Sequence, residues 1–205
     1  MKNAIYCGLR RAGLLSLVLC AGCIVSEVPF AEPEEAVDAS GLIGSWENRV
    51  QKNGEVDSTL MVFEKPDASW PTQTLKVSTK THLPDGTIQR ARTIGFMVKM
   101  GQDEYMHFLN LRLETFEGFD YSAWRKKEKS EFLIFSIRRT DQAFELYAVD
   151  QKKLETLIGK DARETLDSDD VMKLREFLRK EGPENMFQQK VSMKFDRQKD
   201  RASDE

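Results

Sequence analysis

Arg90 and Arg92 are the residues whose type and spacing best suit chemical recognition in this chain of 205 residues. The two-residue period of a β-strand puts both on one face of the segment that continues with Ile94, Phe96 and Val98. Guanidinium groups bind carboxylates and phosphates through paired N–H donors. If this strand reaches the rim of a barrel, the two side chains face its mouth and suit the head group of an amphipathic ligand. If the strand has left the barrel or bulges there, both arginines are solvated.

The two histidines are too few to ligate a metal, because metal sites need three or four ligands. His82 lies beside a turn and His107 on an apolar strand face, and we interpret His107 first as a structural histidine whose ring nitrogens have hydrogen-bond partners. We expect no metal and no other cofactor. The same apolar face could also line a ligand cavity, and the residues expected there are Phe96, Val98, His107, Leu109 and Leu111.

The cysteines argue against covalent chemistry, since Cys7, Cys20 and Cys23 all precede residue 24. The body of the chain therefore offers no thiol nucleophile and no disulfide. No nucleophile elbow, phosphate-binding glycine loop or zinc-protease motif occurs in the sequence. The sequence favours a binding or structural function over an enzymatic one.

The N-terminal segment has a positive flank from Lys2 to Arg11, followed by 11 apolar or small residues, 12–22. That run is too short to span a bilayer and has the length of a secretory signal. Its end, Ala21-Gly22-Cys23, resembles the lipobox of bacterial lipoproteins. The resemblance implies that residues 1–22 are removed and that Cys23 carries acyl chains such as palmitate. An ordinary signal peptide, cut near Ala21 or Gly22 and leaving a free thiol, is the alternative.

The residues after Cys23 bear on location and charge. Ile24 follows the cysteine, and this resembles the pattern of lipoproteins sent to the outer membrane, facing the periplasm of a Gram-negative host. Residues 24–40 hold five acids among 17 residues, so we predict a flexible acidic tether over 23–40. Without residues 1–22, Lys+Arg falls from 31 to 28 against 34 Asp+Glu, a net charge of −6. Such a body is a poor partner for nucleic acid.

From Gly41 onward the apolar pattern has period two, with turns at Asn53-Gly54 and Pro84-Asp85-Gly86. The sequence predicts a mainly β domain over 41–197, in which an antiparallel up-and-down meander closes into a barrel-like sheet. We expect residues 198–205 to be a disordered tail. The predicted strands are 45–50, 58–64, 74–80, 87–100, 104–113, 121–126, 131–138, 143–149 and 190–195.

The segment 131–137 is apolar on both faces, so something must cover it from outside the sheet. Two helices, near 151–159 and 168–181, can do so. The second presents a stripe of Val171, Leu174, Phe177 and Leu178, with Asp167 or Ser168 as its N-cap.

Gly44-Ser45-Trp46 opens the first strand and resembles the first conserved segment of lipocalins and related barrels. This resemblance implies a barrel that binds a small apolar or amphipathic ligand, with Trp46 at its closed end. The alternative is a structural or protein-interaction lipoprotein of the cell envelope with no small-molecule ligand. A cavity lined by the residues around Phe96 and Leu109 would favour the first function. A filled core with an exposed apolar patch would favour the second.

Overall fold

The computed structural model describes residues 24–26, 28–52, 55–68, 70–109, 113–120, 123, 131–161 and 166–198. Its long strands are β3 (Gly44–Lys52), β4 (Glu55–Glu64), β5 (Leu75–His82), β6 (Ile88–Met100), β7 (Asp103–Leu109), β8 (Glu131–Arg139), β9 (Ala143–Ala148) and β10 (Met193–Arg197). Two strands of two residues each, β1 (Ile24–Val25) and β2 (Ala36–Val37), precede them.

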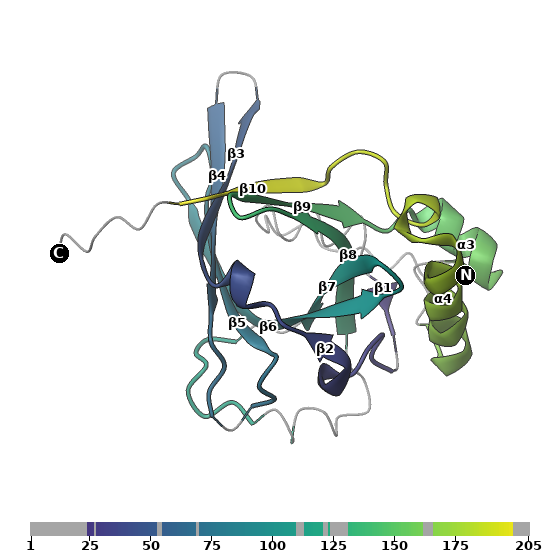
Figure 1. Cartoon of the computed structure of the whole chain (residues 1–205). Helices are drawn as coiled ribbons and strands as arrows, with labels where there is room; N and C mark the ends of the chain where they lie inside the picture. Colours follow the sequence, from purple (N-terminus) through teal and green to yellow (C-terminus); the bar gives the residue numbers. More distant parts are fainter. Residues whose placement is uncertain are drawn as a thin grey trace, which may run out of the picture.

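Strands β3 to β10 form a closed antiparallel barrel (Figure 1). Each strand from β3 to β9 pairs with the next, and β10 inserts between β9 and β3 to close the ring. The predicted up-and-down barrel is therefore confirmed. The strand predicted over 121–126 falls almost entirely outside the described residues.

The barrel interior holds one hydrophobic cluster, which we call the inner core. Its larger members are Trp46, Met61, Phe63, Leu75, Val77, Met97, Met106, Phe108, Leu133, Phe135, Ile137, Phe144, Leu146, Met193 and Phe195. These side chains come from all eight barrel strands, because alternate residues of each strand face inward. The period-two pattern of the sequence thus corresponds to alternating inward and outward side chains on each barrel strand.

A second cluster, the outer core, lies on the outside of β6, β7 and β8. The sheet contributes residues such as Phe96, Tyr105 and Ile134, and helices α3 (Gln151–Ile158) and α4 (Ser168–Glu181) contribute residues such as Leu154 and Leu174. Both helices lie on the opposite side of the molecule from β3 and β4 (Figure 1). The expected cover over segment 131–137 is confirmed: Phe132 and Ile134 belong to the outer core, and Leu133, Phe135 and Ile137 to the inner core.

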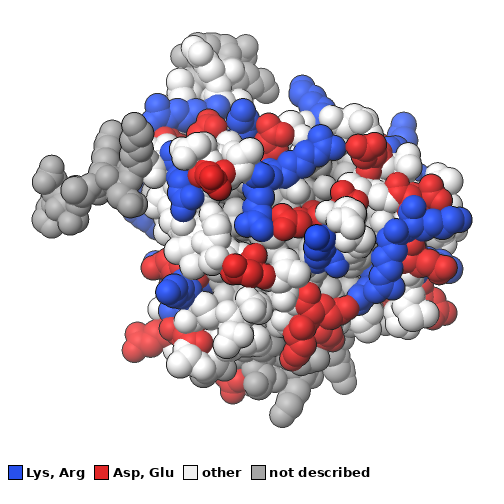
Figure 2. Space-filling view, in the orientation of Figure 1, with Lys and Arg blue, Asp and Glu red and all other residues white. Residues whose placement is uncertain are grey.

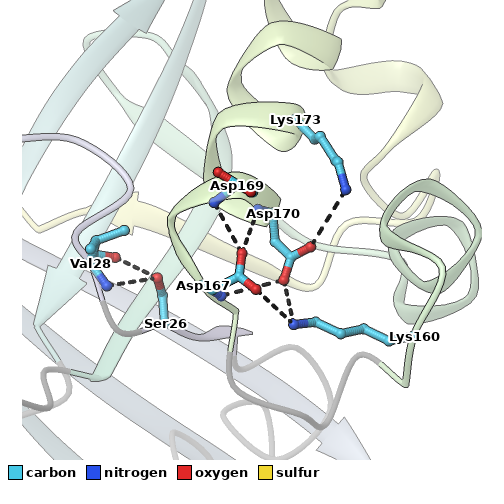
Figure 3. Close-up of polar contacts among 7 residues, drawn as sticks. All are labelled: Ser26, Val28, Lys160, Asp167, Asp169, Asp170 and Lys173. Carbon is cyan, nitrogen blue, oxygen red and sulfur yellow. Dashed lines mark hydrogen bonds and ion pairs between the residues drawn. The ribbon is translucent and has the colours of Figure 1, made fainter.

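Helix α4 begins and ends where the sequence predicted. The Asp167 carboxylate accepts from the backbone N–H groups of Asp169 and Asp170, both at 3.0 Å, and the Asp170 carboxylate accepts from the N–H of Asp167 at 3.3 Å (Figure 3). Lys160 and Lys173 pair with the same buried Asp170. The cluster is a charged cap at the start of α4. Ser26 bridges to Leu166 directly before the helix, and this bridge places the start of α4 beside β1.

The tether prediction is wrong for the described part of residues 23–40. We call residues 24–37 the strap, because β1 pairs with β8 and β2 pairs with β6, so the segment crosses the outer face of β6–β8. Phe30 is only 4% exposed and belongs to the outer core. Glu35, an acid of the strap, accepts from Arg175 of α4 at 3.1 Å. Average composition missed this packing because a few apolar residues spaced among the acids are enough to hold the segment.

Candidate functional site

One end of the barrel is closed around Trp46, near the start of β3. The indole N–H of Trp46 donates to the carbonyl of Leu42 at 2.7 Å, and Leu42 ends the short helix η2 (Ser40–Leu42). The Arg197 guanidinium lies over the Trp46 ring at 4.8 Å and donates to the Ile43 carbonyl at 2.8 Å. Trp46 is fully buried. These contacts link the first and last barrel strands around the buried indole ring.

The interior behind this closed end is filled by side chains. Phe144 packs edge-on against Trp46 at 5.1 Å between ring centroids and stacks on Phe195 at 4.8 Å. At Gly95 a Cβ atom would come within 2.8 Å of the Met106 methyl group, so β6 approaches its neighbours as closely as glycine allows. The described inner core is a packed core of the kind that supports a fold.

Four of the expected cavity residues come together, but on the outside of the barrel. Phe96, Val98 and Leu109 belong to the outer core, and His107 lies between Phe96 and Phe132 in the same layer. Leu111 lies outside the described residues. The two-residue period of β6, β7 and β8 predicts which residues share a face, but both faces of these strands are apolar. It does not fix which face is inside, and the assignment of this face to the interior is wrong.

His107 is the most unusual polar residue of the outer core. Its ring stacks on Phe132 at 5.0 Å, meets Phe96 edge-on at 4.6 Å and lies 6.2 Å from the Phe30 ring of the strap. Neither ring nitrogen has a hydrogen-bond partner among the described residues, and the same holds for the hydroxyl of Tyr105. Burial lowers the pKa of His107 to about 3 and raises the pKa of Tyr105. His107 is therefore neutral, and the prediction that its nitrogens have hydrogen-bond partners is wrong among the described residues.

Arg90 and Arg92 lie on the outer face of the sheet and do not face the barrel mouth. Arg90 is directly opposite Lys80 of β5, and Arg92 is opposite Ser78. The Arg92 guanidinium donates to the carbonyl of Glu114, which fixes it to the segment after β7. Arg90 is exposed. The predicted shared face is confirmed, and of the two alternatives the one with the arginines outside the mouth agrees with the structure, although β6 still pairs with β5 at both positions.

These arginines border a shallow depression of about 170 Å³ on the outer face of β4, β5 and β6, which we call the basic groove. Drug-sized ligands occupy pockets of about 300–1,000 Å³, so the basic groove suits one or two side chains of a larger partner. Leu60 and Val62, both half-buried, supply its apolar surface. Its full lining is Leu60, Val62, Ser78, Thr79, Lys80, Arg90, Ala91 and Arg92.

The charges of the basic groove are not balanced. Lys80 and Arg90 form no ion pair with any described residue, although the neighbouring cation Lys76 pairs with Asp67 at 2.5 Å. The acid nearest along the same row, Glu47, is engaged by Arg49 at 2.8 Å. Over the face shown in Figure 2, by contrast, basic and acidic side chains are interspersed. Two like charges directly opposite each other on neighbouring strands destabilise a sheet.

Sequence reasoning missed Lys80, Leu60 and Val62 as site residues, although a signal was present. The turn centred on Asp85 implies that residues of β5 and β6 pair when their numbers add to 170, which puts Lys80 opposite Arg90. Applying the register of that predicted hairpin to the charged residues would have found the cation pair. Extending the same reasoning to β4 would have added Leu60, which is opposite Lys80.

A second depression, of about 380 Å³, lies between residues 38–43 and the β4–β5 connection around Trp70. Its lining mixes polar and apolar side chains, and the charged residues on it, Asp38, Lys65 and Asp67, do not form a cluster of one sign. Across the described parts of the chain, no three His, Cys, Asp or Glu side chains gather in a way that could bind a metal ion. The helices described there are also too short or too polar to cross a membrane.

Comparisons of the chain with protein-family models, with curated proteins and with solved structures found no match.

Proposed function

We propose that this chain is a lipid-anchored protein of the bacterial cell envelope that binds another protein on the outside of a filled β-barrel. The observation that carries the proposal is the packed inner core, in which a Cβ added at Gly95 would lie 2.8 Å from Met106, 3.1 Å from Phe108 and 3.3 Å from Val77. Because side chains fill the interior of the barrel, binding would take place on its outer surface. The basic groove, with its apolar floor and uncompensated cations, is the surface feature best suited to a partner.

Cys23 is the proposed attachment point for the lipid. The sequence Ala21-Gly22-Cys23 after a short apolar run supports acylation, and two or more chains are needed for a stable anchor because one alone binds only marginally. In a Gram-negative host, Ile24 after the cysteine favours the outer membrane, facing the periplasm.

The anchor is tested by expressing the whole chain in a bacterium and separating membrane from soluble protein. We expect Cys23→Ser to move the protein out of the membrane fraction and to remove the mass of the acyl chains. Cys20→Ser is the matched control, since Cys20 would leave with the signal, and it should stay in the membrane. Equal behaviour of the two variants would contradict acylation at Cys23.

A second function, binding of a small amphipathic ligand, is favoured by one observation. Phe96, Val98, His107 and Leu109 gather under the strap together with polar atoms that have no partner among the described residues. Native mass spectrometry of the protein purified from its own host separates the two functions. A co-purifying small molecule supports the second function, and a co-purifying protein with no added small mass supports the first.

A further inference from the structure

The residues of the basic groove lie in two rows that run across β4, β5 and β6. Leu60, Lys80 and Arg90 form one row, and Val62, Ser78 and Arg92 form the next. Neighbouring strands lie about 4.8 Å apart, so in each row an apolar side chain is roughly 10 Å from an arginine. A partner that covers both rows must therefore present apolar groups on one side and anionic groups on the other.

We propose that the basic groove is the docking site for an acidic segment of another protein, whose carboxylates pair with Lys80 and Arg90 while an apolar side chain lies on Leu60 and Val62. The inference rests on the proposed function and names the site and chemistry of the partner. Lys80 and Arg90 repel each other across the strand pair and have no acid among the described residues. Carboxylates from a partner would relieve that repulsion and form charge-assisted hydrogen bonds.

Strand order favours a protein over the membrane that holds the lipid. In the ring of eight strands, β4 is four places from β8, on the opposite wall, and β5, the central strand of the groove, is three places away, while Arg90 on β6 is two places away. Strand β1, which begins with the residue directly after Cys23, pairs with β8. An anchor at Cys23 would hold the β8 wall towards the bilayer, and the part of the groove on β4 and β5, with Leu60, Val62 and Lys80, would face away from it.

The geometry also favours binding on the sheet face over addition of a strand. Where the groove lies, β5 is paired with β4 along one side and with β6 along the other, so its backbone offers no free edge. Recognition must then come from the side chains Leu60, Val62, Lys80 and Arg90. A short extended segment with an acidic and an apolar residue two positions apart matches this surface best, because both side chains then lie on the face that covers the groove.

The test uses the full acylated chain in detergent and a fluorescent peptide with the repeat Glu-Ser-Val-Ser, which puts Glu and Val on one face and is called the Glu–Val peptide; a Lys-Ser-Val-Ser peptide, the Lys–Val peptide, is the charge control. We expect the Glu–Val peptide to bind, and the affinity to fall at least tenfold in Lys80→Glu. The matched control Lys152→Glu makes the same change in net charge on exposed helix α3 and should leave the affinity unchanged. Binding should also weaken with added salt.

Folding does not confound this test, because Lys80→Glu is expected to stabilise the sheet. The substitution places a carboxylate opposite Arg90 in place of a second cation, and a cross-strand ion pair of this kind should raise the melting temperature by about 1–3 °C. A variant that is more stable and yet binds more weakly identifies Lys80 as a binding residue. No binding of the Glu–Val peptide, or equal loss in Lys80→Glu and Lys152→Glu, would overturn the docking site.

Two further measurements separate failure of this inference from failure of the proposed function. Co-flotation of Cys23→Ser with phosphatidylglycerol vesicles that is lost in Lys80→Glu would overturn a protein partner in favour of anionic lipid. A photo-crosslinker in the host envelope, placed at Ser78 in the groove or at exposed Thr156 on α3, reports on proteins that bind elsewhere. Protein adducts from Thr156 alone would overturn the groove and leave the proposed function intact.

Discussion

The buried imidazole of His107 should make the stability of this fold depend on pH, and His107→Phe should remove that dependence. Burial lowers the pKa of His107 from 6.5 to about 3, and no described charged group offsets that effect. Between these two values the unfolded chain binds a proton that the folded chain does not. The free energy of unfolding therefore falls as pH decreases from 6.5 towards 3, and is constant above 6.5 for this group.

The size of the effect follows from the two pKa values. One pH unit between them corresponds to about 1.4 kcal/mol, so His107 should lower the free energy of unfolding by about 2 kcal/mol between pH 7.5 and pH 5. Carboxylates do not obscure this window. Glu35 and Glu104 have pKa values below their usual 4.5, mainly because arginines bond to them, so their contributions are lost only at lower pH.

Urea denaturation followed by tryptophan fluorescence at pH 7.5, 6.5, 5.75 and 5 measures the effect. The unmodified protein should lose about 2 kcal/mol across this range, and His107→Phe should lose little. Phenylalanine keeps a ring between Phe96 and Phe132 and removes two buried nitrogens that have no partner among the described residues. His82→Gln, at an exposed position, is the matched control and should keep the slope. An unchanged slope in His107→Phe would refute the burial of a neutral imidazole.

Three other substitutions test the packing and electrostatics of the barrel. Gly95→Ala would place a methyl group 2.8 Å from a methionine methyl, and urea denaturation should show a loss of about 1–3 kcal/mol; an unchanged free energy would mean spare room inside. Arg197→Ala removes the stacking on Trp46 and two bonds to backbone carbonyls, so we expect a loss of about 1–2 kcal/mol and a red-shifted tryptophan emission. Arg139 holds the pKa of Glu104 below 4.5, so stability from this pair is full above pH 4.5 and falls in more acid solution; Glu104→Gln should flatten that acid limb in a pH series of melting temperatures.

Local signals in the sequence predicted the elements well. Helix α4 runs from Ser168 to Glu181 as expected, because Asp167 caps its start and Gly182 followed by proline ends it. The turn at residues 84–86 predicted the β5–β6 hairpin, since Pro fixes one backbone angle and Gly86 adopts a φ of +80°. Signals of this kind act over a few residues and need no knowledge of the rest of the fold.

The inside and the outside of the barrel could not be told apart by the same means. Phe96 and Met97 are neighbours on β6, both fully buried, and they belong to different cores. Alternation assigns them to opposite faces, but each face is apolar enough to be interior. The choice depends on where α3, α4 and the strap pack, and those contacts join residues far apart in the chain. For a strand that is covered on both faces, alternation therefore cannot show which face lies inside the barrel.

The strap also changes what a lipid on Cys23 would do. A flexible tether of 17 residues could extend to roughly 55 Å and would let the barrel stand off the membrane. With β1 paired to β8, the chain instead meets the barrel wall at Ile24, one residue after the anchor. The barrel would then be held close to the bilayer in a restricted orientation, with β4, on the wall opposite β8, turned outward. A short anchor of this kind would suit the proposed function, in which the barrel presents a fixed outer surface to a partner.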